Sequence, residues 1–141
     1  MRPLRRCGIV LGSRKAKQAS WWDDAAHFTK ASASLRVLRD LISSSLRRFE
    51  QAADDERALT SLDFQTMINL TKVEASELAV STVMSALRAC GLSGYRNDSP
   101  FAIGRHLRDV LSSPIMINND RILANIGTTA LMSAVPASLW D

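Results

Sequence analysis

The residues best suited to chemistry lie in the last third of the chain, where residues 90–122 read CGLSGYRNDSPFAIGRHLRDVLSSPIMINNDRI. The first feature of this segment is a Gly-x-x-Gly turn formed by Gly91 and Gly94. Glycine has no Cβ, so such a turn would let a phosphate or a cofactor approach the backbone closely. The turn lacks the spacing of a phosphate-binding loop and no strand precedes it. A tight connection between two helices is therefore the competing interpretation.

Charged side chains follow the glycine turn. Arg105 and Arg108 could contact an anion or a cofactor, because a guanidinium group presents several donors to a negative partner. Arg105 and Asp109 are four residues apart, however, and such a pair can form an ion pair across one helical turn. Both interpretations stay open at this point. Lys72, farther upstream, stands among small and apolar residues, where a lysine usually extends its stem toward solvent.

Potential metal ligands are few and scattered. Cys7 and Cys90 have no cysteine or histidine partner at ligand spacing, and His27 and His106 are isolated from each other. Because no C-x-x-C or H-x-x-x-H pattern occurs, we expect no metal site. Two cysteines without a disulfide framework indicate reduced thiols, and hence a cytoplasmic protein.

The positive charge of the chain is concentrated at its start. Residues 1–20 hold six basic residues and no acid, whereas the whole chain has a net charge of +4, so the remainder is slightly negative. We therefore expect a basic, disordered tail at residues 1–20 and a helical domain at residues 21–141. A basic tail alone does not predict a nucleic-acid-binding protein. The sequence holds no apolar run of about 18 residues, so we expect no membrane span.

Two long helices must position these residues. The first is expected at 33–54, where apolar side chains recur at spacings of three and four and form one stripe. The second is expected at 61–90, with a capping box at Thr60 and Asp63 before it and Gly91 directly after it. The stripe of the first helix consists of Leu35, Leu38, Ile42, Leu46 and Phe49.

Two shorter helices complete the pattern. The third is expected to begin at Ser99-Pro100, where serine caps and proline suits the first helical position, and to end at Pro114. The fourth is expected from Asn119 or Asp120 to about Ala134. No strand pattern competes, so the sequence predicts an all-α fold, an up-down helical bundle.

Taken in order, these features resemble the C-terminal helical domain of the acyl-CoA dehydrogenase family. That domain has a helix with a central lysine, as at Lys72, then a glycine-rich turn, as in ALRACGLSGY, and then an Arg-Asp step, as at Arg108 and Asp109. The resemblance covers about residues 33–134. It implies one further helix before residue 33, so the bundle is expected to be incomplete at its N-terminal side.

The resemblance implies a flavoenzyme of fatty acid metabolism. Members of the family bind FAD and remove hydrogens from the α and β carbons of an acyl thioester. A carboxylate base takes the α proton, and the flavin accepts a hydride from the β carbon. The glycine turn and the segment after the Arg-Asp step line the cofactor, so the resemblance places Gly91, Gly94, Asn118 and Asn119 at FAD.

The chain departs from the family at the residues that matter most for catalysis. Ile117 stands where many members have the catalytic glutamate, and an isoleucine cannot take a proton. Asp120, three residues farther on, is the remaining carboxylate candidate, and Leu92 replaces a second glycine in the turn. The resemblance also covers one of the three domains of a complete enzyme.

Two functions follow as expectations. The first is a C-terminal domain or subunit of an FAD-dependent oxidoreductase that is inactive alone and joins a homo-oligomer or a larger flavin-binding subunit. The second is a non-enzymatic helical dimerisation or interaction module, which would keep the bundle without the chemistry. A bundle lacking one helix would expose an apolar groove, which suits such a module.

Overall fold

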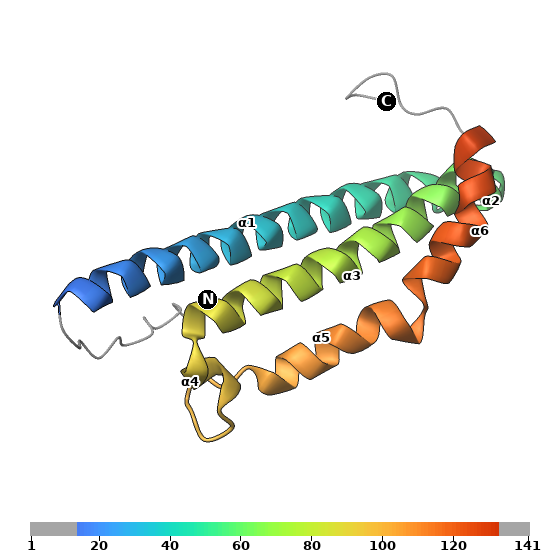
Figure 1. Ribbon diagram of the computed structural model, residues 1–141. Helices are drawn as coiled ribbons and strands as arrows, with labels where there is room; N and C mark the ends of the chain where they lie inside the picture. The colour runs from blue at the N-terminus through green and yellow to red at the C-terminus, as the bar shows by residue number, and fades with distance from the viewer. Residues whose placement is uncertain (1–13, 133–141) are drawn as a thin grey trace.

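A computed structural model describes the backbone of residues 14–132 and the side chains of residues 24–128 and Leu131 (Figure 1). This part of the chain is helical and contains no strand, which confirms the predicted all-α class. The elements in chain order are α1 (Arg14–Ala52), α2 (Glu56–Thr60), α3 (Leu62–Cys90), α4 (Leu92–Tyr95), α5 (Gly104–Met116) and α6 (Asn119–Met132).

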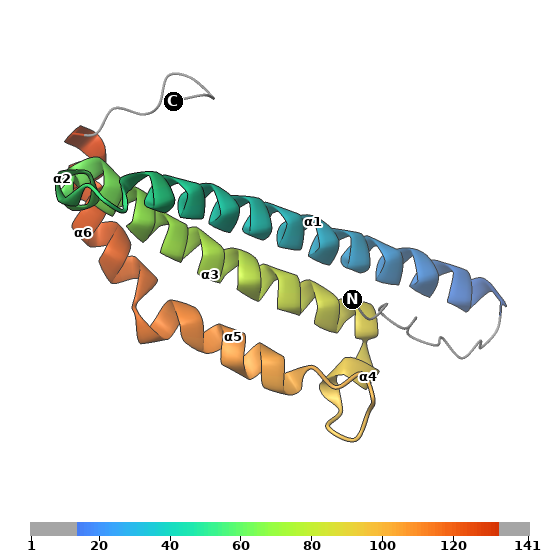
Figure 2. The same cartoon turned by 180° about the vertical axis from the view of Figure 1, so that it is seen from behind.

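The helices α1 and α3 form a long antiparallel hairpin, which the short α2 closes at one end (Figures 1 and 2). At about 1.5 Å per residue, α1 is about 58 Å long and α3 about 44 Å, so α1 projects beyond the end of α3. The helix predicted to start at residue 33 begins at Arg14 instead. Residues 14–32 have no regular apolar stripe, but they contain good helix formers and neither glycine nor proline.

The division into a tail at 1–20 and a domain at 21–141 stays a prediction. The start of α1 at Arg14 places residues 14–20 in the helix, whereas residues 1–13 lie outside the described part of the chain.

The start of α3 depends on a serine cap. Ser61 Oγ accepts a hydrogen bond from the backbone N–H of Phe64 at 3.2 Å, so Ser61 and not Thr60 is the N-cap residue. Thr60 belongs to the last turn of α2, where its hydroxyl donates to the carbonyl oxygen of Glu56 at 2.7 Å. The predicted capping box was therefore one residue out of place, because the short helix α2 occupies the connection and Thr60 is its last residue.

The third predicted helix starts later than expected. Ser99 Oγ accepts from the backbone N–H of Phe101 at 3.1 Å, and this turn places the helix start at Gly104. The backbone N–H of Ile103 then donates to the carbonyl oxygen of Gly94 at 2.9 Å, which ties the loop to α4.

The predicted end of that helix was also wrong. Pro114 lies inside α5, which continues to Met116. A proline removes one backbone donor, but Lys72 of α3 donates to the carbonyl oxygen of Ser113 at 3.2 Å and thereby supports this last turn. The predicted start of α6 at Asn119 is confirmed, whereas its predicted end at Ala134 lies outside the described residues.

The two helices of the hairpin meet along a seam of alanine, serine and leucine side chains on α1. On α1 the seam recurs at alternate spacings of three and four, through Ala31, Ser34, Leu38, Leu41 and Ser45, all of them half-buried. Ser45 Oγ and Thr71 Oγ1 form a hydrogen bond of 2.8 Å across it. Most of the apolar stripe read from the sequence lies beside this seam, although Leu38 is part of it and the ring centroid of Phe49 lies 6.5 Å from that of Phe64 on α3. Apart from Leu38, its members stay 38–53% exposed.

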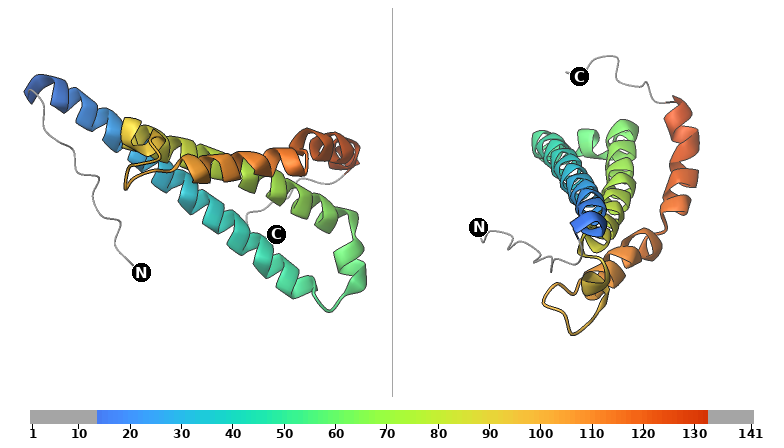
Figure 3. Two further views of the ribbon diagram at one scale, coloured as in Figure 1. Left: turned by 90° about the horizontal axis from the view of Figure 1, so that it is seen from below. Right: turned by 60° about the vertical axis from the view of Figure 1, so that its left-hand side comes forward.

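The second half of the chain covers the other side of α3. The helix α5 lies on the side of α3 away from α1, and α6 bends back toward the α2 end of the hairpin (Figures 1 and 3). The buried hydrophobic side chains of the described residues are Val73 on α3 and Ile126 on α6. So small a buried core leaves several apolar faces open.

Candidate functional site

The lysine in the middle of α3 closes the corner between α5 and α6. Its ammonium group donates to the carbonyl oxygens of Ser113 and Ile117 and to Oδ1 of Asn119. The two carbonyl groups belong to the C-terminal end of α5, where the helix dipole is negative, so a cation is stabilising there. The sequence predicted that Lys72 extends toward solvent. In the structure it points instead to the C-terminal end of α5.

Asn119 completes this group of residues, which we call the Lys72 cluster: Lys72, Ser76, Glu77 and Asn119. Asn119 Nδ2 donates to Ser76 Oγ and to Glu77 Oε1, each at 2.9 Å. Ser76 in turn donates to the carbonyl oxygen of Val73 at 2.8 Å. Asn119 is 5% exposed and Ser76 4%, so the hydrogen-bonding groups of the asparagine are used inside the protein.

The residues around Asn119 are exposed. Ile117 is 62% exposed, and Asp120 lies at the surface in the first turn of α6. Asn118 caps α6, because its Oδ1 accepts from the backbone N–H of Arg121 at 3.2 Å. The proposed roles of Asn118 and Asn119 at a cofactor, and of Asp120 as a base, stay predictions. The structure shows helix capping and corner packing for the two asparagines.

The two glycines of the predicted turn differ in their surroundings. Gly91 ends α3 with a φ of 54°, a left-handed value that favours glycine, and a Cβ placed there would meet nothing within 4 Å. Gly94 is buried, and a Cβ there would lie 2.8 Å from the Cβ of Cys90 and 3.2 Å from Cδ1 of Leu87. Gly94 is thus explained by close packing of α4 on α3, whereas the backbone of Gly91 is open to a partner.

The predicted residues form two groups and not one compact site. Gly91 and Gly94 lie beyond the end of α3, whereas Ser76, the partner of Asn119, lies 15 residues earlier on that helix. At about 1.5 Å per residue the two groups are about 22 Å apart along α3. They lie at opposite ends of α5 (Figure 1).

The arginines of α5 are at the surface. Arg105 Nε and Asp109 Oδ2 are 3.7 Å apart, with side chains 83% and 58% exposed. The i,i+4 ion pair that the sequence suggested is therefore present, although an exposed pair contributes only about 0–1 kcal/mol to stability. Arg108 is exposed on the same helix.

A second ion pair, between Arg96 and Asp98, was not predicted from the sequence. Arg96 Nε donates to Asp98 Oδ1 at 2.9 Å in the loop before α5. This hydrogen bond holds the pKa of the Asp98 carboxyl below its usual range and raises the pKa of Arg96. The alternation of charges in YRND was the available signal. Because the pair is exposed, it orders the loop and does not form a site.

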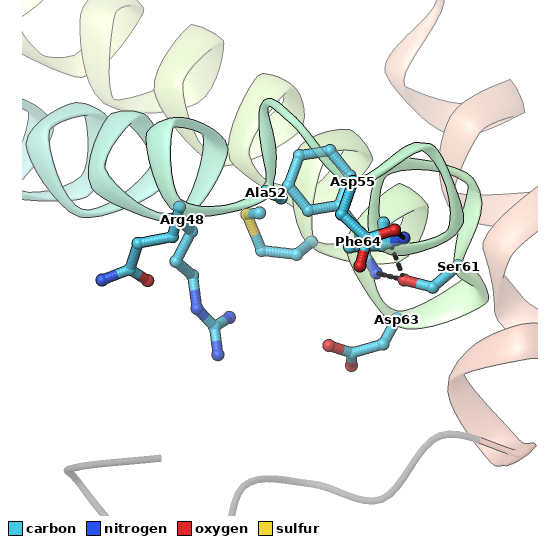
Figure 4. A pocket seen from close by; sticks show the side chains of 9 residues that line it. Arg48, Ala52, Asp55, Ser61, Asp63 and Phe64 are labelled. Atoms are coloured by element: carbon cyan, nitrogen blue, oxygen red, sulfur yellow. Dashed lines mark hydrogen bonds between the residues drawn. The ribbon is translucent and has the colours of Figure 1, made fainter.

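A shallow pocket of about 290 Å³ lies at the closed end of the hairpin, and none of the residues predicted as a site lines it (Figure 4). Its polar side chains belong to Arg48, Gln51, Asp55, Ser61 and Asp63. Asp55 already caps α2 and Ser61 already caps α3, so both are used by the backbone. The lining residues are Arg48, Gln51, Ala52, Asp55, Ala58, Ser61, Asp63, Phe64 and Met67.

Two kinds of site are missing from the described residues. No group of three or more histidine, cysteine, aspartate or glutamate side chains could hold a metal ion there. In the same part of the chain, no helix is long and apolar enough to cross a membrane.

The fold and the Lys72 cluster thus define an all-α domain, in which a long hairpin supports a third helix and a bent fourth one. Residues 11–113 match the family model described as acyl-CoA dehydrogenase, C-terminal domain. Because this match covers most of the chain, the protein belongs to the acyl-CoA dehydrogenase C-terminal domain family. Searches of curated proteins and of solved structures gave no significant match.

The extent of the match refines the resemblance. It begins at residue 11, so the N-terminal half of α1 is part of the family domain, whereas the resemblance in the sequence began at residue 33. It ends at residue 113, so it includes Gly91 and Gly94 but stops before Ile117–Asp120.

Proposed function

We propose that this chain is the helical domain or subunit of an FAD-dependent oxidoreductase of the acyl-CoA dehydrogenase type, which acts on the CH–CH bond of an acyl thioester. In this proposal the chain supplies one wall of the flavin site, and another domain or subunit holds most of the cofactor. The observation that carries the proposal is the family match over residues 11–113.

The described residues do not fit a self-contained FAD site. The side chain of Asn119 is buried and fully hydrogen-bonded within the Lys72 cluster. The space beside Gly94 is occupied by the side chains of Cys90 and Leu87. Leu92, which is 74% exposed, adds a side chain beside Gly91. An exposed edge remains at Gly91–Leu92, and a second one at Ile117–Asn118. Such edges support a contact surface and not an enclosed pocket.

The catalytic base is proposed to come from elsewhere in the assembly. The side chain of Ile117 offers no proton acceptor, and Asp120 is exposed at the surface. The role that remains for this chain is to position the cofactor and to exclude water from it. The Lys72 cluster would hold the segment 117–120 in place, and the glycine turn would admit a cofactor close to the backbone of Gly91.

A titration of the ¹⁵N-labelled full chain with FAD, followed by amide chemical shifts, tests the proposal. The amides of residues 91–95 and 117–120 should shift most, even when binding is too weak to survive gel filtration. Shifts confined to the basic residues 1–20 would show only attraction of the pyrophosphate to positive charge, and would contradict the proposal. The absence of any shift at high FAD concentration would contradict it as well.

A matched pair of variants sharpens this test. Leu92→Asp adds a negative charge beside the glycine turn and should weaken the shifts there, because it repels the pyrophosphate. Leu62→Asp makes the same change at the other end of α3, where Leu62 is 56% exposed, and should leave the shifts unchanged. Equal effects of the two variants would show that only the net charge matters.

A second candidate function is a helical interaction module without chemistry. Ile117 in place of a carboxylate favours it, as do exposed apolar side chains on α5 and α6, with Ile115 at 75% and Met116 at 80%. This function predicts self-association or partner binding with no response to FAD. The titration above therefore separates the two candidates.

A further inference from the structure

The pocket at the closed end of the hairpin has an apolar lining between two opposite charges. Figure 4 shows Arg48 and Asp63 on opposite sides of it. Its volume of about 290 Å³ is at the lower limit of small-molecule pockets, which measure about 300–1,000 Å³. A pocket of this size suits one large side chain and its neighbour better than a free cofactor. The apolar side chains that line it are those of Ala52, Ala58, Phe64 and Met67.

We propose that residues 139–141 of this chain fill the pocket, with the Trp140 ring on Met67 and Phe64. The indole N–H of Trp140 donates to the Asp63 carboxylate, and the carboxylate of Asp141 lies at Arg48. The segment 133–141 reads SAVPASLWD and lies outside the described residues. The inference does not depend on flavin binding and goes beyond the proposed function.

The helix α6 brings this segment to the end of the hairpin that holds the pocket. It starts where Asn119 Nδ2 donates to Ser76 Oγ, and it bends back toward α2 (Figures 1 and 2). Met67 stands nine residues before Ser76, about 14 Å along α3, whereas the 14 residues of α6 span about 21 Å. Residues 133–139 cover up to about 23 Å when extended. The segment is therefore long enough to reach the pocket from the end of α6.

The face of α3 that contacts α6 adjoins the pocket. Glu77 Oε1 accepts from Asn119 of α6, whereas the ring of Phe64 meets that of Phe49 on α1. The rim at Asp63 is therefore the one nearer to α6, and the rim at Arg48, on α1, is the far one. At about 100° per residue, four side chains follow one another around α3 at intervals of about 40–60°, in the order Glu77, Asp63, Met67 and Phe64.

The order of side chains in the segment matches the order of the two rims. A chain that comes from α6 passes Asp63 first, where Trp140 finds the acceptor that a buried indole N–H usually has. It meets Arg48 last, where Asp141 follows Trp140, and a guanidinium group has five N–H donors to share among its partners. Asp55, the other carboxylate of the pocket, is already bonded to the N–H groups at the start of α2.

Nuclear Overhauser contacts test the proposal in the full chain, labelled with ¹⁵N and with ¹³C in the methionine methyl groups. The Trp140 indole proton should contact the Met67 methyl group, with the two signals assigned from Trp140→Phe and Met67→Leu. The absence of this contact would overturn the proposal. In a mixture of chains that carry only one label each, the contact should vanish. A contact that persists there would overturn the proposal as well, because the segment would then come from a second copy.

A matched pair of tryptophan variants provides a second test. Trp140→Ala should shift the backbone amide signals of residues 61–67, because it empties the pocket. Trp22→Ala makes the same change in α1, 26 residues before Arg48 and thus about 39 Å away along the helix, and should leave these signals unchanged. Equal shifts in the two variants, or none in Trp140→Ala, would contradict the proposal.

Charge exchange tests the position of Asp141. The Trp140 indole proton exchanges with solvent only when the segment opens, so its exchange rate reports the open fraction. Arg48→Glu and Asp141→Arg should each raise this rate about threefold or more, because each replaces attraction by repulsion. The double variant should return to within about twofold of the original rate. Arg47→Glu is the control and should leave the rate unchanged, since the exposed Arg47 does not line the pocket.

A double variant that exchanges as fast as the single ones would overturn the placement of Asp141 at Arg48. None of these results bears on the FAD titration, because residues 91–95 and 117–120 do not line this pocket.

Discussion

Lys72 shows how one half-buried charge can support the end of a helix. Its ammonium group joins three acceptors at the corner between α5 and α6, and Asn119 links it to Ser76 and Glu77. This role could not be predicted from the sequence, because the acceptors lie 41 to 47 residues away along the chain. Two of them are backbone carbonyl groups, which carry no residue-type signal.

Replacing this lysine should therefore be costly. Lys72→Met keeps the apolar stem but leaves Asn119 Oδ1 and the carbonyl groups without their donor, so the free energy of unfolding should fall by about 1–3 kcal/mol. Urea denaturation measures this as a lower midpoint at unchanged slope. Lys30→Met, at an exposed position of α1, is the matched control and should change stability by less than about 0.5 kcal/mol. Similar losses of stability in both variants would show that the hydrogen bonds of the Lys72 cluster do not stabilise the fold.

The pairing of Lys72 with Asn119 can be measured directly. A double-mutant cycle of Lys72→Met and Asn119→Ala should give a coupling of about 0.5–3 kcal/mol, because the two side chains are in contact within one network. Additive losses would show that the two residues act independently, and would leave the corner of α5 and α6 without its explanation.

At the scale of elements, the pattern of the sequence predicted the middle of each helix better than its ends. The predicted helix 61–90 differs from α3 by one residue, because an apolar face and a following glycine mark it, although the cap was predicted at Thr60 and not at Ser61. The start of α1 was missed because residues 14–32 are helical without an apolar stripe. The end of α5 was misplaced because support from Lys72 allows the helix to continue past Pro114. Of the candidate site, the roles of Gly91 and Gly94 at a cofactor stay predictions, and only the structure separates the packing role of Gly94 from the open edge at Gly91.

The junction of α3 with α4 gives a prediction at this scale. Gly94→Ala would bring a Cβ to 2.8 Å from the Cβ of Cys90, so stability should fall by about 1–3 kcal/mol through overpacking. Gly127→Ala in α6 is the control, because a Cβ there meets nothing within 4 Å. Alanine is the better helix former, so thermal unfolding of this variant should occur at the same or a higher temperature. A tolerated Gly94→Ala would mean that α4 is free to move from α3.

The N-cap of α3 gives a second prediction at the scale of elements. Ser61→Ala should lower the free energy of unfolding by about 1 kcal/mol, since the Phe64 N–H loses its acceptor. Thr60→Ala should cost less, because the Thr60 hydroxyl only bonds back to carbonyl oxygens of its own helix. The reverse order in chemical denaturation would place the cap at Thr60, as the sequence pattern suggested.

At the scale of the whole molecule, the exposed apolar stripe of α1 ties stability to concentration. Among the described residues, the buried hydrophobic side chains are Val73 and Ile126. If the chain is an interaction module, the second candidate function, we expect a second copy to supply part of the core. A partner that binds only the folded state raises the apparent stability by mass action. The thermal midpoint of the full chain should therefore rise with protein concentration, and Leu46→Asp should remove this dependence. A midpoint that does not change with concentration would mean that the hairpin is stable with its stripe in water. The seam of alanine, serine and leucine side chains between α1 and α3 would then be a sufficient core.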